Sequence, residues 1–199
     1  MILLIAMPKR RPKKIIKTTD VAPKLRKALA KRTKGELIDF LAELAKEDRR
    51  VLRQLDARFD LEAAPAELAA ATRQAIADAT AFDERDSNSN FDYDYAAYEE
   101  VKRNLTRLVD QEQLRLAMEI ALELMDQGSE QVEMSDEGLM TQDIEECLAV
   151  VTQALKKCDL PASEVIAWCA EMAKRDRMGF IFDRELAAQR NHFEGLRSP

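Results

Sequence analysis

Apolar residues recur at intervals of three and four along most of the chain, and no run alternates between apolar and polar residues for long. The first spacing places apolar side chains on one face of an α-helix, whereas a strand face needs alternation. Helix-breaking residues are scarce, because only 5 glycines and 6 prolines occur in 199 residues. These patterns predict an all-α protein, built as an array of antiparallel helical hairpins.

Several helix starts follow from capping residues. Thr33 with Glu36 three residues later has the pattern of a capping box, which satisfies backbone N–H groups at a helix N-terminus. Pro65 suits the first turn of a later helix, because its missing N–H is not needed there. Asp92 or Asp94 can cap the helix that begins near residue 95.

The C-terminal half contains further boundary signals. Gly128 predicts a helix end, and an acidic loop is expected over residues 129–140. Thr141 and Asp183 predict helix starts, and Pro161 begins a helix that ends near Gly179. The expected helices cover roughly 22–32, 37–45, 51–59, 66–82, 95–108, 111–128, 142–155, 165–176 and 184–193.

A weak internal repeat is visible in the second half. Residues 114–129 align with 147–162 at an offset of 33, which pairs Ala121 with Ala154 and Leu122 with Leu155. This period is close to those of tetratricopeptide and ankyrin repeats. The aromatic and glycine positions of the tetratricopeptide consensus do not line up, so the pattern predicts an irregular α-helical repeat that is tetratricopeptide-like at most.

Charge is distributed unequally along the chain. Residues 1–34 contain twelve Lys/Arg and one acid, a net charge of +11, whereas the other 165 residues contain nineteen Lys/Arg and thirty-six Asp/Glu, a net charge of −17. We expect residues 1–20 to form a disordered basic arm and residues 21–199 to form one α-helical domain. The arm can bind nucleic-acid phosphates without sequence preference. The basic residues of the arm are Lys9, Arg10, Arg11, Lys13, Lys14 and Lys17. The alternatives are a solvated tail, a tail that folds back on the acidic body, and an anionic surface or protein partner.

The apolar stretch MILLIA at the start spans only six residues. A membrane helix needs about 20 apolar residues, and a secretory core roughly 7–15 with basic residues before it. The sequence therefore predicts no membrane association and a cytoplasmic location. Met7 is a plausible alternative first residue.

The segment FDERDSNSNFDYDYAAYEE, residues 82–100, combines acids, turn-forming residues and aromatics. As a calcium loop it lacks the glycine at position 6 and the glutamate at position 12 in the frame that starts at Asp86. No pair of its carboxylates stands out as a catalytic acid and base. The preferred interpretation is a linker with a helix cap, whose aromatics cover the end of the core or line a groove. The alternative is a partner-binding patch made of Phe91, Tyr93, Tyr95 and Tyr98.

Neither a metal site nor a catalytic centre is indicated elsewhere. The three cysteines, Cys147, Cys158 and Cys169, have no CxxC spacing and are interpreted as core residues. The only histidine is His192, and the sequence contains no GxGxxG, GxxxxGK[ST], HExxH or GxSxG motif. We therefore expect no enzyme activity, no cofactor and no bound metal.

Two segments resemble a known family when taken together. They are KGELIDFLAELAKEDRRVLRQLDARF and FDYDYAAYEEVKRNLTRLVDQEQLRLAMEIALELMDQG. Both are similar to the α-helical region that accompanies SWIM-type zinc fingers in bacterial proteins of unknown function, and the likeness covers roughly residues 34–186. The finger's own CxC and CxH ligands are missing from this chain, so the resemblance implies a fold and carries over no zinc or nucleic-acid role.

Two functions are compatible with the sequence. The first is a non-enzymatic helical scaffold or adaptor that binds another protein through the aromatics of residues 91–98 and the acidic loop. The second is a nucleic-acid-associated protein that binds phosphates through the basic arm. The first should keep its partner when the arm is removed, whereas the second should lose binding steeply with salt.

Overall fold

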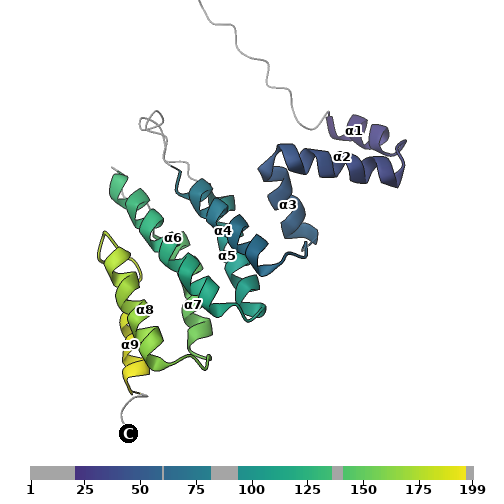
Figure 1. Ribbon diagram of the computed structural model, residues 1–199. Helices are drawn as coiled ribbons and strands as arrows, with labels where there is room; N and C mark the ends of the chain where they lie inside the picture. The colour runs from purple at the N-terminus through teal and green to yellow at the C-terminus, as the bar shows by residue number, and fades with distance from the viewer. Residues whose placement is uncertain (1–20, 60, 82–93, 136–140, 196–199) are drawn as a thin grey trace, which may run out of the picture. The chain divides into compact units, whose positions relative to one another are not determined.

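The computed structural model of the chain describes residues 21–59, 61–81, 94–135 and 141–195. Within these ranges all regular secondary structure is α-helical, which confirms the predicted all-α fold (Figure 1). The helices are α1 (Val21–Leu29), α2 (Lys34–Glu47), α3 (Arg49–Phe59), α4 (Pro65–Ala79), α5 (Tyr95–Asp110), α6 (Leu114–Met134), α7 (Gln142–Leu155), α8 (Ala162–Arg175) and α9 (Asp183–Gly195).

The chain divides into two compact units, Met1–Leu55 and Asp56–Pro199. The first unit contains α1, α2 and most of α3, and the second contains the end of α3 and helices α4 to α9. Among the described residues, the buried apolar core begins at Leu68 and so belongs to the second unit. Residues 21–199, which the sequence predicts as one α-helical domain, include parts of both units.

The second unit is an array of three antiparallel hairpins, α4/α5, α6/α7 and α8/α9. Helices α4, α6 and α8 pack side by side in one layer, and α5 packs on α7 in the other (Figure 1). The predicted array of helical hairpins is therefore confirmed for this unit. Stacking pairs of helices in this way gives each hairpin a neighbour that covers its apolar face.

A continuous apolar core fills the space between the two layers. Every helix from α4 to α9 contributes to it, because each has apolar side chains at intervals of three and four. The largest fully buried side chains are those of Leu68, Ile76, Leu105, Leu108, Ile120, Leu124, Met125, Ile144, Leu148, Leu155, Met172 and Ile181. Burying one such side chain contributes about 1.5–3 kcal/mol to folding.

Buried hydrogen bonds tie the hairpins to one another. The hydroxyl of Tyr98 on α5 donates to Oε1 of Gln131 on α6 at 2.7 Å, and Nε2 of Gln131 donates to the carbonyl of Ala79 on α4 at 2.8 Å. The indole Nε1 of Trp168 on α8 donates to the carbonyl of Met118 on α6 at 3.0 Å. These bonds satisfy polar groups that would be costly to bury alone.

Ion pairs at the surface also join neighbouring hairpins. Arg73 on α4 contacts Glu123 on α6 at 2.9 Å, and Arg115 on α6 contacts Glu164 on α8 at 2.7 Å. In the other layer Lys102 on α5 contacts Glu146 on α7 at 2.7 Å. Exposed pairs of this kind contribute at most about 1 kcal/mol each, so the core determines the packing of the hairpins.

Several predicted helix starts are confirmed. The Thr33 hydroxyl accepts from the Glu36 N–H at 3.2 Å, and the Thr33 N–H donates to the Glu36 carboxylate at 2.7 Å, which completes the capping box of α2. The Asp94 carboxylate accepts from the Ala97 N–H at 3.1 Å and caps α5. Pro65 stands in the first turn of α4.

The predicted helix end at Gly128 is wrong. Helix α6 continues through this glycine to Met134, so residues 129–134 are helical and do not belong to a loop. A Cβ at position 128 would lie 2.8 Å from Cδ1 of Ile144 on α7. Gly128 therefore permits close helix packing, which outweighs the modest cost of a glycine inside a helix.

Two other boundaries differ in detail from the expectation. Helix α7 begins after Thr141 as predicted, but the Thr141 hydroxyl contacts the Glu145 carboxylate and makes no capping bond to the backbone. Helix α8 ends at Arg175, before Gly179, and the Asp176 carboxylate accepts from the Gly179 N–H at 2.9 Å. An aspartate turn thus determines where α8 ends, and Gly179 supplies the positive φ of 71° that follows.

The predicted offset of 33 residues does not match the hairpins. Helices α4, α6 and α8 begin at Pro65, Leu114 and Ala162, at nearly equal intervals that are longer than the offset. Ser129 lies inside α6, whereas its aligned counterpart Ala162 begins α8. The alignment therefore pairs different parts of successive hairpins, and a repeat in the sequence is not confirmed.

Candidate partner-binding surface

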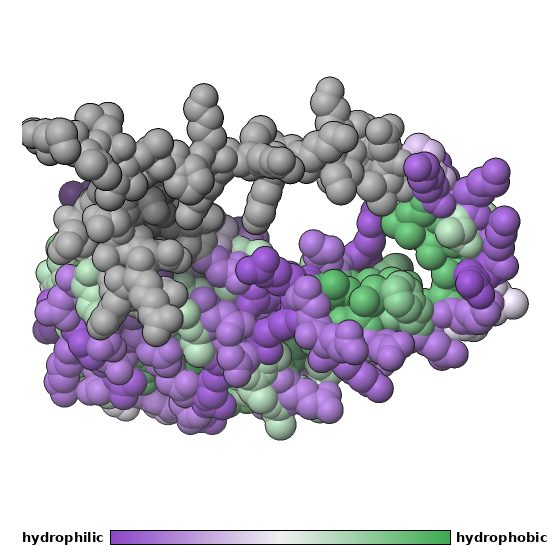
Figure 2. Space-filling view, turned by 90° about the horizontal axis from the view of Figure 1, so that it is seen from above, coloured by the Kyte–Doolittle hydropathy of each residue, from purple (hydrophilic) through white to green (hydrophobic). Residues whose placement is uncertain are grey.

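Large apolar side chains are exposed on α1 and α2 of the first unit. Leu25 is 53% exposed, Ile38 54% and Phe40 50%, and Leu29 and Leu41 are also exposed. Figure 2 shows hydrophobic residues gathered at the right-hand side of the view, where these helices lie. We call the set Leu25, Leu29, Ile38, Phe40 and Leu41 the apolar surface of the first unit.

Helix α2 forms although it buries none of its side chains. Seven of its 14 residues are apolar, and they lie at helical spacing between Leu37 and Ala45. The capping box at Thr33 fixes its first turn, and hydrogen bonds from the Thr33 backbone and hydroxyl lower the pKa of Glu36. An isolated helix shorter than about 12–15 residues is marginal in water, so its stability depends on burial of the apolar face.

Helices α1 and α2 do not pack extensively on each other, and the turn between them covers neither apolar face. The only ion pair that joins this turn to α2 among the described residues is Arg32 with Glu36, at 3.5 Å and mostly exposed. Contiguous exposed apolar surface is uncommon in soluble proteins and marks a place where another molecule binds. The two helices are therefore a candidate binding surface.

The predicted aromatic patch is only partly placed at a surface. Tyr95 is 51% exposed at the start of α5, whereas Tyr98 is 3% exposed and its hydroxyl donates to Gln131 inside the core. Burial raises the pKa of the Tyr98 hydroxyl. Phe91 and Tyr93 lie outside the described residues. Tyr98 is thus a core residue and not part of a binding patch, which corrects the prediction.

The acidic segment after Gly128 is also different from the expected loop. Asp126, Glu130 and Glu133 lie on one face of α6, where Arg177 contacts their carboxylates at 3.7, 3.3 and 3.6 Å. These acids attach the turn after α8 to α6, so part of their charge is neutralised within the chain. Residues 136–140 of the predicted loop lie outside the described residues.

The nucleic-acid prediction concerns residues that the structure does not describe. Lys9, Arg10, Arg11, Lys13, Lys14 and Lys17 all precede residue 21. In the described part, the basic character continues along α1, where Lys24, Arg26 and Lys27 are exposed. The arm and α1 therefore have the same sign of charge.

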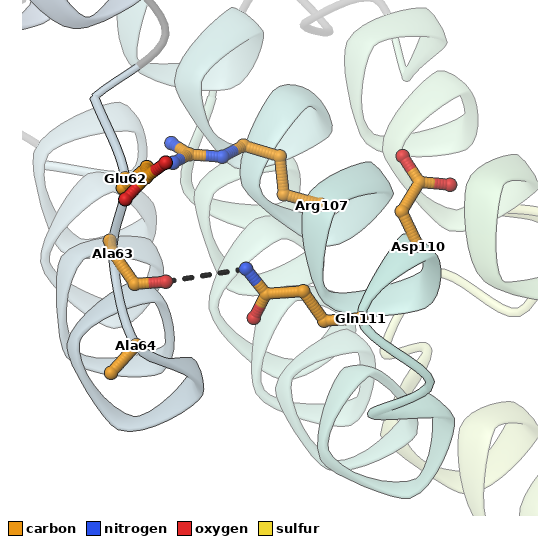
Figure 3. A pocket seen from close by; sticks show the side chains of 6 residues that line it. All are labelled: Glu62, Ala63, Ala64, Arg107, Asp110 and Gln111. Atoms are coloured by element: carbon orange, nitrogen blue, oxygen red, sulfur yellow. Dashed lines mark hydrogen bonds between the residues drawn. The ribbon is translucent and has the colours of Figure 1, made fainter.

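A cleft of about 610 Å³ lies in the second unit beside the segment that leads into α4. It is lined by Glu62, Ala63, Ala64, Arg107, Asp110 and Gln111. In Figure 3, Arg107 on α5 and Gln111 directly after its end reach toward the segment 62–64, whereas Asp110 points away from it.

The polar groups of this cleft hold the chain in place. Nε2 of Gln111 donates to the Ala63 carbonyl at 3.2 Å, and the Arg107 guanidinium donates to the Leu61 carbonyl and contacts Asp56 at 3.3 Å. Arg103 contacts the same Asp56 carboxylate at 3.0 Å. These contacts connect the end of α3 to α5, and the bonds of Arg107 and Gln111 to the segment 61–63 position the entry to α4.

Cys147 and Cys169 are buried in the core of the second unit. Burial raises the pKa of the Cys147 thiol to about 12 and that of the Cys169 thiol to about 11, so both stay protonated and unreactive at neutral pH. The S–H of Cys147 donates to the Tyr98 carbonyl at 3.5 Å. Within the described residues, no group of three or more His, Cys, Asp and Glu side chains could hold a metal ion.

The apolar surface of the first unit was visible in the sequence but was interpreted differently. The spacing of Leu37, Ile38, Phe40, Leu41 and Leu44 predicted a helix face, and such a face is ordinarily covered by the core. The pattern predicts the face without identifying what covers it. The sequence also shows that α2 stands between two basic helices, because α1 and α3 each carry a net charge of +3.

Among the described helices, none is sufficiently long and apolar to cross a membrane. The chain matches no model of a known protein family, no curated protein and no solved structure. The resemblance to the helical region beside SWIM-type fingers therefore stays a prediction.

Proposed function

We propose that this protein is a non-enzymatic helical adaptor that binds another protein chain through the apolar surface of the first unit. The observation that supports this is the exposure of Leu25, Ile38 and Phe40 on helices that have no core of their own. The second unit supplies a stable hairpin array to which this surface is attached. Binding would cover the apolar faces of α1 and α2 and stabilise both helices.

Helix-in-groove recognition is the mode that fits these residues. An amphipathic helix presents side chains at intervals of three and four to a partner, as Phe40 and Leu44 or Leu25 and Leu29 do here. Aromatic and large aliphatic side chains contribute most of the energy at such contacts. Phe40, which is 50% exposed, is the residue that we expect to contribute most to binding.

A binding assay with a matched control tests this proposal. Three proteins are compared by capture of chemically cross-linked partners: the unchanged full chain, the double variant Ile38→Glu/Phe40→Glu, and the control variant Phe180→Glu. Phe180 is a suitable control because it is 54% exposed but belongs to the second unit. We expect the double variant to lose the partners and the control to keep them. Equal capture by all three proteins would contradict the proposed surface.

A second candidate function is binding of nucleic acid through residues 8–17, with additional phosphate contacts from the exposed lysines and arginine of α1. The favouring observation is that residues 1–55 carry sixteen Lys/Arg against six Asp/Glu, a net charge of +10. Fluorescence anisotropy of labelled DNA and RNA distinguishes this function, with the full chain and a chain that starts at Val21. Phosphate binding should weaken steeply with salt and with removal of the arm, whereas an adaptor should keep its protein partner when the arm is removed.

A further inference from the structure

Helix α1 has an apolar side and a basic side, and both are exposed. Leu25 is 53% exposed and Leu29 36%, and the two lie one turn apart on the same side of the helix. Lys27, which is two residues from each leucine, is exposed on the opposite side. Lys24 and Arg26 each stand one residue from Leu25, so their side chains project on its two flanks. The apolar side of α1 is therefore bordered by positive charge on both flanks.

The charge of α1 and of the turn after it has one sign. Residues 21–35 contain six Lys/Arg and no acid. Within the described ranges, the side chains of Lys24, Arg26 and Lys27 form no ion pair. An anionic ligand that also accepts aliphatic side chains would therefore use both properties of α1 at once.

Nucleic acid uses only one of these properties. Its phosphates attract the lysines and the arginine, but Leu25 and Leu29 would stay uncovered, and residues 21–35 contain no aromatic side chain on which a base could stack. The surface of an anionic lipid bilayer uses both properties. Aliphatic side chains enter the boundary between head groups and acyl chains, while flanking lysines and arginines reach the lipid phosphates.

Closure of α1 on α2 within one chain also uses only one property. Asp39 and Glu43, each two residues from Leu41, lie on the side of α2 opposite its apolar face. If the two apolar faces packed together, these acids and Lys27 would point away from the contact, so charge would not strengthen it. An anionic bilayer instead presents negative charge along the whole edge of the contact, where the other two bases of α1 lie.

We propose that α1 binds the surface of an anionic lipid bilayer. Leu25 and Leu29 would lie in the boundary between head groups and acyl chains, and Lys24 and Arg26 would contact lipid phosphates beside them. Lys27 would point away from the bilayer toward water.

A helix in the plane of the bilayer surface differs from a spanning helix. It needs neither the length nor the apolarity of a spanning helix, which none of the described helices has. The sequence prediction of no membrane association considered only a spanning helix and a secretory segment, so the inference differs from it in the mode of contact. The inference also goes beyond the proposed function, because α1 takes lipid while Ile38 and Phe40 on α2 stay available for the protein partner.

Co-sedimentation of the full chain with lipid vesicles tests the apolar contact. The vesicles contain phosphatidylcholine alone or phosphatidylcholine with about 30% phosphatidylserine, and we expect binding only to the second kind. The double variant Leu25→Gln/Leu29→Gln should lose at least about tenfold in affinity for these vesicles. The matched control is Phe180→Gln, which removes an apolar side chain of similar exposure, 54%, from the second unit and should bind as the unchanged chain does.

A second pair of variants tests the charged flanks. Lys24→Gln with Arg26→Gln removes two positive charges beside Leu25 and should lower the affinity for the anionic vesicles about thirtyfold. Lys156→Gln with Lys157→Gln removes the same charge from exposed positions of the second unit and should leave the affinity unchanged. Equal losses for the two pairs would show attraction by net charge without a site on α1, which overturns the inference.

The leucine variant separates the lipid surface from other polyanions. If Leu25→Gln/Leu29→Gln keeps the affinity for anionic vesicles, the segment attracts phosphates in general, and the inference is overturned in favour of nucleic-acid binding. Absence of vesicle binding by the unchanged chain, or equal binding to both kinds of vesicle, also overturns it. The adaptor function is decided separately by the capture experiment without vesicles, and its double variant Ile38→Glu/Phe40→Glu should still bind anionic vesicles.

Discussion

Helices α2 and α6 have similar patterns in the sequence but opposite environments in the structure. Both have apolar residues at intervals of three and four. Helix α6 buries ten of its 21 residues between α4, α7 and α8, whereas α2 buries none of its 14. The comparison shows that amphipathic spacing predicts a helix and its apolar face, but that the neighbouring elements determine whether the face is a core or a binding surface.

The largest difference between the two units is expected when a large apolar side chain is shortened to alanine and the free energy of unfolding is measured. Leu124→Ala, at a fully buried position of α6, should lower the free energy of unfolding by about 2–5 kcal/mol. Ile38→Ala on α2 should change the stability of the second unit by less than about 0.5 kcal/mol. Trp168, the only tryptophan, is buried in α8 and reports unfolding of this unit in urea by fluorescence. Equal losses for the two variants would contradict the division.

The close contact at Gly128 gives the next largest effect. Gly128→Val would place methyl groups against Ile144, and overpacking of this kind costs about 1–3 kcal/mol. A second change, Ile144→Ala, should recover part of this loss because it makes room for the new side chain. The loss would be below 0.5 kcal/mol, with no dependence on Ile144, if Gly128 ended a helix as the sequence suggested.

Two tyrosines on α5, one buried and one exposed, test how much the buried hydrogen bond to Gln131 contributes to stability. Tyr98→Phe leaves Oε1 of Gln131 without its donor and should cost about 1–3 kcal/mol. Tyr95→Phe, at an exposed position, should change stability by a few tenths of a kcal/mol. Urea unfolding followed by Trp168 fluorescence measures both variants. A larger loss for the Tyr95 variant would show that the burial of the two residues is reversed.

A buried glutamine on α9 should be replaceable with a gain. Gln189 is fully buried, and neither atom of its side-chain amide has a hydrogen-bond partner among the described residues. Gln189→Met keeps the volume and removes the cost of burying the amide, so we expect stability to rise by about 1 kcal/mol. A decrease in the urea midpoint would show that the amide is satisfied.

The smallest effect concerns the start of α2 and its pH dependence. The pKa of Glu36 is lowered from its ordinary value of 4.5 by hydrogen bonds from Thr33, so the ionised form stabilises the helix. Because the folded pKa is the lower one, this stabilisation is complete above the unfolded pKa and is lost as the pH falls through the folded pKa. The side-chain carboxyl resonance of Glu36, followed by NMR, should titrate with a midpoint below pH 4.5. The variant Thr33→Val should move this midpoint upward. A midpoint at or above 4.5 would contradict the capping box.

Much of the fold was predictable from local patterns. Thr33, Pro65 and Asp94 marked helix starts correctly, because capping depends on residues three or four positions away. Gly128 was misleading because its role depends on Ile144, which belongs to another helix and comes near only in the fold. Tyr98 was placed in a surface patch for the same reason, since its partner Gln131 is on α6.

The candidate site was less predictable than the fold. The spacing that gave Phe40 and Leu41 a helix face is the same spacing that gives Leu124 and Met125 theirs. Only the packing of whole helices, which depends on contacts distant in sequence, separates a covered face from an exposed one. The charges on α1 and α2, by contrast, could be counted from the sequence.

Hydrogen exchange measured by mass spectrometry on the full chain tests the central claim most directly, with samples at low and high protein concentration. We expect amides of α5, α6 and α7 to be protected at both concentrations, because they belong to a complete core. Amides of α1 and α2 should exchange rapidly at both concentrations, because the apolar residues of these helices are exposed in the single chain. Protection of α2 equal to that of α6 in the dilute sample would contradict the account, because the apolar face would then be covered within the single chain.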